Sequence, residues 1–250
     1  MQPQPRAFFA AIACLSLALA AAADAAVVVV DAGHGGADHG AHANGVREKD
    51  VALAIAREIG RALEARAIQV VHTRTDDAFV PLAERTSIAN RAEADLFLSV
   101  HANSSPSPHA NGPETYFVSL DASDAEARRV AMLENNVFEQ ADAVGDSSDV
   151  VGAILGDLIR TDHLRASSEL AAGLQRRLAG LGARGRGVKQ APFVVLMGVN
   201  MPAALLEIGF LTNARDARRV SAPAQQRRIA RAVAKAVDAW LASQGRGSAE

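Results

Sequence analysis

The stretch Val27-Val28-Val29-Val30-Asp31-Ala32-Gly33-His34-Gly35-Gly36 joins an apolar, β-branched run to a glycine-rich turn. Four consecutive valines predict a strand that is buried between two layers. Glycine allows backbone conformations and close approaches that other residues cannot make, so the turn can aim the His34 side chain. The glycine spacing matches neither common phosphate-binding motif. A strand followed by a turn with an incidental histidine explains this motif, taken alone, equally well.

A second strand also ends on a histidine, and a carboxylate lies near a helix start. His101 follows the apolar run that begins at Leu96, and Glu48 stands just ahead of a predicted helix. Ligands gather at the carboxyl ends of strands in open α/β sheets, so His34 and His101 are expected to converge there. Two imidazoles and one carboxylate suit a catalytic zinc, which keeps its fourth position open. The residues are far apart in sequence, so their spacing alone is only moderately specific.

A lone acid, Glu207, stands near the end of a third apolar run, within residues 203–213. An unpaired buried carboxylate is costly, so such a group is usually paired, metal-bound or kept protonated with a raised pKa. One interpretation is a general base beside the metal. The other is a glutamate on an edge strand that faces water.

Taken together, these blocks resemble the zinc-dependent N-acetylmuramoyl-L-alanine amidases, which hydrolyse peptidoglycan during bacterial cell separation. The resemblance implies that His34, Glu48 and His101 bind Zn²⁺ and that Glu207 is the catalytic carboxylate. It also implies cleavage of the amide between N-acetylmuramic acid and L-alanine. The matching blocks appear in the family's order and cover nearly all of the chain after residue 25; they are residues 31–36, 48–50, 73–74, 94–103 and 206–210.

The chemistry of these residue types agrees with that function. Amide hydrolysis needs an activated water, a polarised carbonyl and a proton for the departing amine, which a zinc ion and one acid/base residue supply together. Two alternatives stay open: a zinc peptidase that cuts within the stem peptide, and a non-catalytic wall-binding regulatory protein. The complete set of three ligands and Glu207 argues against the second.

The first 25 residues have the pattern of a secretory signal peptide. Arg6 precedes an apolar stretch over residues 8–22, and Ala23-Asp24-Ala25 fits a small-x-small cleavage site. A membrane anchor is the alternative, but the stretch is short for a span. A lipoprotein modified at Cys14 is a further alternative. We therefore expect an exported, periplasmic protein with no stable membrane anchor, and a catalytic domain over residues 26–245.

The composition predicts one α/β domain. The chain has 250 residues, a net charge of −2 and a single cysteine, and no Pro/Gly/Ser-rich linker divides it. Nothing in this balance suggests a nucleic-acid partner. The pattern predicts a layered domain whose central sheet is mostly parallel or mixed and is flanked by helices. We expect strands at 27–31, 68–72, 95–101, 115–119, 193–197 and 203–207, and helices at 50–65, 82–94 and 223–242.

Residues 120–165 form a helical insertion between strands. Val130, Leu133, Val137 and Ala141 make one apolar stripe, and Glu134 is expected on the same face. An acid in such a stripe needs a partner, and zinc is one candidate. The resemblance points the same way, because some division amidases carry a helix that blocks the active site. The alternative is a solvent-facing glutamate.

A second helical pattern in the insertion has a wide apolar face at Ile154, Leu155 and Leu158. Such a face is usually buried against its own domain. It also suits an activator protein that docks on an amphipathic helix. The remaining partner implied by the family is the peptidoglycan substrate.

Overall fold

The computed structural model describes residues 25–135, 161–181 and 184–246. Its centre is a six-stranded sheet in the order β4-β1-β5-β8-β6-β7. The first four strands in that order are parallel, whereas β6 is antiparallel to β8 and parallel to β7. The expected mixed α/β sheet is confirmed. The strands are β1 (Val27–Ala32), β4 (Gln69–His72), β5 (Leu96–Asn103), β6 (Glu114–Val118), β7 (Val188–Ala191) and β8 (Ala203–Phe210). A separate hairpin pairs β2 (His42–Ala43) with β3 (Val46–Arg47).

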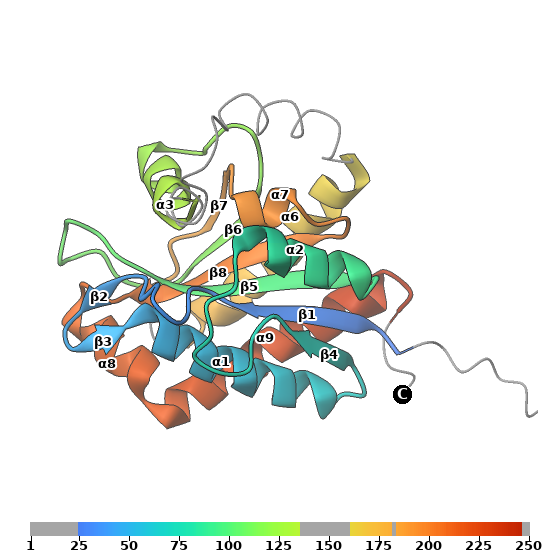
Figure 1. Cartoon of the computed structure of the whole chain (residues 1–250), viewed down its shortest axis with the longest axis horizontal. Coiled ribbons are helices and arrows are strands. Elements are labelled where there is room, and N and C mark those ends of the chain that lie inside the picture. Colours follow the sequence, from blue (N-terminus) through green and yellow to red (C-terminus); the bar gives the residue numbers. More distant parts are fainter. Residues whose placement is uncertain (1–24, 136–160, 182–183, 247–250) are drawn as a thin grey trace, which may run out of the picture.

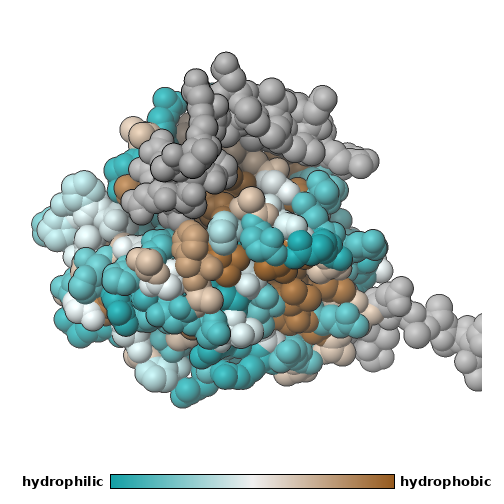
Figure 2. All heavy atoms as spheres, in the orientation of Figure 1, coloured by the Kyte–Doolittle hydropathy of each residue, from teal (hydrophilic) through white to brown (hydrophobic). Residues whose placement is uncertain are grey.

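Helices cover both faces of this sheet (Figure 1). One core cluster joins the sheet to α1 (Glu48–Glu64), α6 (Thr161–Ala179) and α9 (Pro223–Ser243). The other joins it to α2 (Leu82–Arg91), α3 (Ala125–Asn135) and α7 (Val194–Met197). The last element, α8 (Ala214–Ser221), follows β8. Hydrophilic side chains dominate much of the visible described surface, as expected when the apolar helix faces turn inward (Figure 2).

The two long amphipathic helices have the predicted stripes. Val51, Ile55, Ile59 and Leu63 of α1 are buried, and so are Ile229, Val233, Val237 and Leu241 of α9. Residues three and four apart share one helix face, so each stripe packs as a continuous ridge. No helix among the described residues is both long and apolar enough to cross a membrane.

Strand alternation puts the polar groups on a single face of the sheet, the face of α2, α3 and α7. Val29 and Phe97 belong to the core cluster on that face. Because alternate residues share a face, the later odd-numbered positions of the same strands follow them there. These positions, at or near the carboxyl ends of the parallel strands, are Asp31 of β1, Ser99 and His101 of β5, and Glu207 of β8.

Three expectations about elements need correction. The strand predicted at 193–197 is the short helix α7, and the strand lies earlier, at Val188–Ala191. The long helix α6 was not expected. The stripe proposed for α3 is wrong at Leu133, whose side chain is exposed, although Val130 is buried. Val137 and Ala141, like Ile154, Leu155 and Leu158, lie outside the described residues.

Candidate metal centre

Four side chains converge beyond the carboxyl ends of β1 and β5. They are His34, Glu48, His101 and Glu134, and one possible ligand atom from each lies within 4.8 Å of all the others. His101 Nδ1 is 2.9 Å from Glu48 Oε1 and 2.9 Å from Glu134 Oε2. His34 Nε2 is 3.1 Å and 3.2 Å from the same two oxygens. The three ligands expected from the sequence are therefore neighbours in the fold.

The donor atoms are arranged around a common point. His34 Nε2 and Glu134 Oε2 are buried and have no hydrogen-bond partner, although they lie 3.2 Å apart. Four donors around a tetrahedral zinc, at bond lengths of about 2.0–2.1 Å, would be separated from one another by roughly 3.3 Å. The observed spacings of 2.9–3.2 Å approach that value. The donor set and its spacing fit a zinc ion.

The turn after β1 holds His34 in a strained conformation. Its backbone has φ of +59°, in the left-handed region that favours glycine. Arg74 donates to the carbonyl oxygens of Ala32 and Gly33, and Arg85 donates to those of Ala32 and His34. Both guanidinium groups are buried. They satisfy the backbone of the turn, which over-determines this conformation and offsets its strain.

Two contacts orient the histidine rings. His34 Nδ1 lies 2.7 Å from Asp38 Oδ2, which leaves Nε2 to face the other three groups. This kind of carboxylate partner fixes the ring and tautomer of a metal-binding histidine. Gly33 makes room for the second ring, because a Cβ there would stand 2.4 Å from His101 Cε1. Sequence analysis missed Asp38, whose only signal is its place four residues after His34.

Glu48 is the first residue of α1 and is held by backbone amides. Its Oε2 accepts from Ala41 N at 2.8 Å, and its Oε1 accepts from Ala102 N at 2.9 Å. Burial opposes ionisation, but the adjacent His34 and His101 keep the pKa of Glu48 well below its usual value. A fixed, ionised carboxylate is what a metal ligand requires.

The electrostatic field at the two histidines comes from these carboxylates. Burial alone would lower the pKa of His101, but Glu134 and Glu48 raise it to about 10. The pKa of His34 is likewise raised, by Glu48 and Glu134 and against the effect of burial. The site thus attracts positive charge, which protons or a metal cation can supply.

Glu207 lies next to this group in the sheet. It pairs in register with His101 on β5 and with Glu114 on β6. Its side chain is fully buried and neither carboxylate oxygen has a hydrogen-bond partner. Burial, reinforced by the charges of Glu134 and Glu48, raises the pKa of Glu207 well above its usual value. Because β8 is an inner strand, the alternative of an edge glutamate that faces water is wrong.

A second buried glutamate, Glu114, was missed by sequence analysis. Its Oε1 pairs with Arg186 at 2.7 Å and with Lys189 at 3.0 Å. Its Oε2 accepts from the Tyr116 hydroxyl at 2.9 Å and from Asn103 Nδ2 at 3.1 Å. Unlike Glu207, it has every partner that a buried carboxylate needs. Among these two buried glutamates, only Glu207 has carboxylate oxygens without a hydrogen-bond partner.

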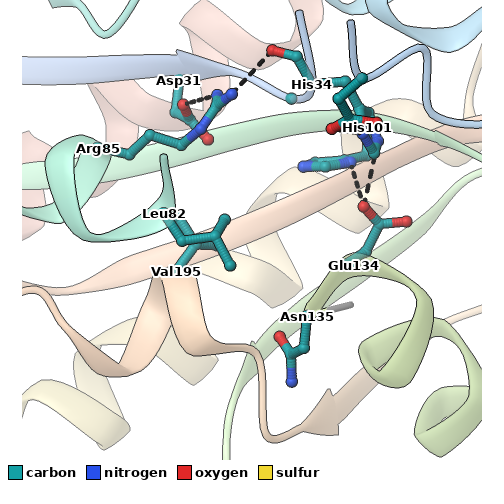
Figure 3. Close-up of a pocket in the computed structure, with 10 residues that line it drawn as sticks. Asp31, His34, Leu82, Arg85, His101, Glu134, Asn135 and Val195 are labelled. Atoms are coloured by element: carbon teal, nitrogen blue, oxygen red, sulfur yellow. Dashed lines mark hydrogen bonds and ion pairs between the residues drawn. The ribbon is translucent and has the colours of Figure 1, made fainter. Parts of the chain in front are cut away.

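Glu134, at the end of α3, has two polar partners, His34 and His101. Its side chain is 13% exposed and its carboxylate faces His34 and His101 (Figure 3). The alternative of a solvent-facing glutamate is therefore wrong. The other histidines near the turn, His39 and His42, are exposed and do not belong to the group.

Comparisons with known proteins agree with one another. Residues 28–239 match the family described as N-acetylmuramoyl-L-alanine amidase. The chain is 36% identical over 219 residues to the amidase AmiA of Escherichia coli K12, covering 86% of this chain and 76% of AmiA. The crystal structure of an N-acetylmuramoyl-L-alanine amidase from Clostridium difficile 630 superposes with a TM-score of 0.67 at 29% identity, covering 88% and 99% of the two chains. AmiC2 of Nostoc punctiforme gives 0.63 at 29% identity, covering 87% and 97%.

Proposed function

Since the chain belongs to the N-acetylmuramoyl-L-alanine amidase family, we propose that it cleaves the amide between N-acetylmuramic acid and L-alanine through a zinc site made by His34, Glu48 and His101. Glu207 is the general base and acid. Glu134 fills the remaining position and keeps the enzyme inactive until its helix moves. The observation that carries this proposal is the convergence of the four donor atoms beside a buried, unpartnered carboxylate.

In this mechanism a bound zinc ion supplies Lewis-acid polarisation of the scissile carbonyl and lowers the pKa of the attacking water. Glu207 accepts the proton of that water at a carboxylate oxygen and passes it to the leaving nitrogen. Its burial and lack of partners suit this role, because no hydrogen bond must break before the carboxylate takes a proton.

The position of Glu134 supports the autoinhibition that we propose. Its carboxylate lies 2.9 Å and 3.2 Å from the two histidine donors, where a substrate oxygen would have to lie. A substrate cannot reach the site while α3 stays in place. We expect Glu134→Ala to raise basal hydrolysis of purified sacculi, with Glu126→Ala on the same helix as the matched control. Equal basal rates in the wild type and Glu134→Ala would contradict autoinhibition.

The remaining parts of the proposal concern export and partners. We propose that residues 1–25 are a signal peptide, that residues 26–245 form the catalytic domain, and that the protein acts in the periplasm. An activator would release Glu134 by docking at Ile154, Leu155 and Leu158. An amidase of the same fold has been solved with a partner protein: the CwlD amidase of Clostridioides difficile in complex with the GerS lipoprotein, which superposes with a TM-score of 0.66 at 21% identity.

The central test combines metal analysis with product analysis. The domain should contain close to one zinc per chain, and His101→Ala should lose both zinc and activity. His109→Ala, an exposed histidine in a loop, is the matched control. Mass spectrometry of digested sacculi should show free stem peptides that begin with L-alanine, and a chelator should abolish them. Cuts inside the stem peptide would indicate the zinc-peptidase alternative, and full zinc occupancy in His101→Ala would overturn the ligand assignment.

A further inference from the structure

Charge is unevenly distributed along the chain. The net charge of the whole sequence is −2, but residues 170–246 contain 13 basic and only 3 acidic residues. Two of these acidic residues, Glu207 and Asp216, are buried, and the third is Asp238. The surface that this part of the chain forms is therefore basic. A surface of one sign attracts a partner of the opposite sign.

Eight exposed basic side chains of this region gather on three helices. Helix α9 packs against both α6 and α8. On α9, four of the eight fall within an arc of roughly 100° at 3.6 residues per turn, opposite the buried stripe of that helix. We call the set the basic surface, and its members are Arg176 and Arg177 of α6, Arg215 and Arg218 of α8, and Arg227, Arg228, Arg231 and Lys235 of α9.

The basic surface is not neutralised by its neighbours. Among the residues that the structure describes, none of its eight side chains forms an ion pair, because the nearby acids pair with other arginines. These pairs are Arg165–Glu169 at 3.1 Å, Arg219–Asp216 at 3.0 Å and Arg66–Asp238 at 3.7 Å. Pairs of opposite charge three or four residues apart commonly balance an exposed helix face. Here the positive charge is left to meet a partner.

The basic surface begins at the edge of the sheet where the metal-ligand group lies. Helix α8 starts just after the carboxyl end of β8, the strand of Glu207. Helix α6 ends near the same edge, because Gln175 donates to Pro113 O, beside the register partner of Glu207. From this edge α9 runs back along the face of the sheet opposite α2 and α3 (Figure 1). A partner bound along α8 and α9 can therefore reach the metal-ligand edge.

The composition of the basic surface favours a hydrated polyanion rich in carboxylates. Seven of its eight members are arginines, whose planar guanidinium groups pair with carboxylates through two hydrogen bonds. A helix that enters a membrane surface presents apolar side chains to it, and a site for single-stranded nucleic acid presents aromatic ones. Among the described residues, the large apolar side chains that are exposed lie outside these helices; they are Phe79, Leu120, Met132 and Leu133.

We propose that the basic surface binds free carboxylates of peptidoglycan stem peptides near the one that is cut, and so holds the domain on the insoluble polymer. The proposed function supplies the identity of this polymer, and the proposal rests on it to that extent. Stem peptides contain free carboxylates, and a sacculus presents many of them side by side. Each exposed ion pair is weak, but several formed at once add up to useful affinity.

The experiment measures binding without cleavage. Zinc-loaded protein with Glu207→Gln is pelleted with purified sacculi over a range of NaCl concentrations. A triple variant, Arg227→Gln with Arg228→Gln and Arg231→Gln, removes three charges from the basic surface, and glutamine is also a good helix former. The matched control has the same net charge but removes three exposed arginines that are paired with acids; it combines Arg47→Gln, Arg91→Gln and Arg165→Gln.

We expect the triple variant to raise the apparent Kd for sacculi about tenfold at low salt, because each exposed ion pair contributes only modestly. The control should bind like the starting protein. The difference should vanish in about 1 M salt, where the Debye length falls to about 3 Å. Sacculi whose carboxylates are amidated with a carbodiimide and a neutral amine should bind the starting protein no better than the triple variant binds native sacculi.

Three results would overturn the proposal. One is an equal Kd for the triple variant and the control, in proteins that thermal melting shows to be folded. Another is undiminished binding to amidated sacculi. The third is a loss by the triple variant on phosphatidylglycerol vesicles but not on sacculi, which would assign the basic surface to lipid headgroups.

Failure of the proposed function is recognised separately. With Glu207 intact and Glu134→Ala present to open the site, the triple variant should cleave a soluble muramoyl peptide at an unchanged rate and digest sacculi more slowly. If the Glu134→Ala protein cleaves neither substrate, the proposed function is overturned. The pelleting comparison needs no hydrolysis, so it still decides whether the basic surface binds the polymer.

Discussion

At the scale of single residues, the site depends on close packing around the turn that carries His34. Gly33 leaves room for the ring of His101, and Gly40 leaves room for His34, since a Cβ there would lie 2.5 Å from its Cδ2. Arg74 and Arg85 fix the backbone between these points. The positions of both imidazoles are therefore set by their neighbours before any ligand arrives, which is the preorganisation that catalysis needs.

Glu207→Gln separates chemistry from metal binding. Glutamine keeps the shape of the side chain but cannot accept and return a proton, so we expect hydrolysis to fall by roughly 10²-fold or more. Zinc content should stay near that of the wild type, because Glu207 is not assigned as a ligand. Metal analysis beside single-turnover kinetics measures both quantities, and near-normal turnover would show that another group moves the proton.

Asp31 makes the buried network under the turn sensitive to acid. Burial opposes its ionisation, but Arg85 and the hydroxyls of Ser99 and Thr73 hold the pKa of Asp31 below its usual value. Its contribution to stability is then complete at neutral pH and is lost as the pH falls through that lowered pKa. Asp31→Asn leaves Arg85 buried without a charge partner, and we expect a loss of about 3–5 kcal/mol in the free energy of unfolding at pH 7.

Urea unfolding checks this prediction at two pH values. The difference between Asp31→Asn and the wild type should shrink in strong acid, where both lack the charge. Asp50→Asn removes an aspartate that is 47% exposed and paired with Arg47, and it should cost less than about 1 kcal/mol. An equal cost for the two variants would contradict the role of burial.

At the scale of elements, the last turn of α3 is hydrogen-bonded to the start of α7 and to the segment just before it. Asn135 Nδ2 donates to Pro192 O at 2.8 Å, and Asn135 Oδ1 accepts from Val194 N at 2.9 Å. Both bonds hold the residue next to Glu134. We therefore expect Asn135 to help keep Glu134 over the histidines.

Asn135→Ala should raise basal amidase activity by up to about 30-fold, because two lost hydrogen bonds of about 1 kcal/mol each favour the displaced helix. The effect should be smaller than that of Glu134→Ala, which removes the proposed blocking group itself. Hydrolysis of purified sacculi without an activator measures the rate. Asn200→Ala, at an exposed asparagine, is the control, and an unchanged rate in Asn135→Ala would show that the two hydrogen bonds of Asn135 have no regulatory role.

The elements also differ in how well the sequence predicts them. Strands β1, β5 and β8 are recognisable because both of their faces are buried, so nearly every residue is apolar. Strand β7 is an edge strand, and its polar residues Lys189 and Gln190 hide that signal. The apolar run at 193–197 predicts a strand but forms α7, because composition alone does not distinguish a short buried helix from a buried strand. The ligands could be inferred from strand ends and family motifs. Asp38 and Glu114 could not, because their partners are set by tertiary packing.

At the scale of the whole molecule, the proposed zinc site joins parts of the chain that are far apart in the sequence. His34 follows β1, Glu48 begins α1 and His101 lies in β5. An ion that binds only the folded arrangement stabilises it by mass action, by about 2.7 kcal/mol at a concentration 100 times its Kd.

Removal of zinc should therefore lower the melting temperature by roughly 5–10 °C, given about 2–4 °C per kcal/mol for a domain of this size. Differential scanning calorimetry of the loaded and chelated protein measures the shift. The chelator should leave the melting temperature of His101→Ala unchanged, since that variant has no zinc to lose. A shift of equal size in that variant would assign the stabilisation to another site.

Asp95 lies just before β5, at the opposite end of the strands from the histidines. Its carboxylate accepts from the backbone of Val27, at the start of β1, and forms an ion pair with Arg246, just beyond α9. Both ends of the described domain are thus gathered at the amino ends of the strands. A bulky fusion or a surface linkage at either end would therefore lie on the side of the domain opposite the metal-ligand group. A molecule immobilised in this way would still expose that group to an insoluble polymer.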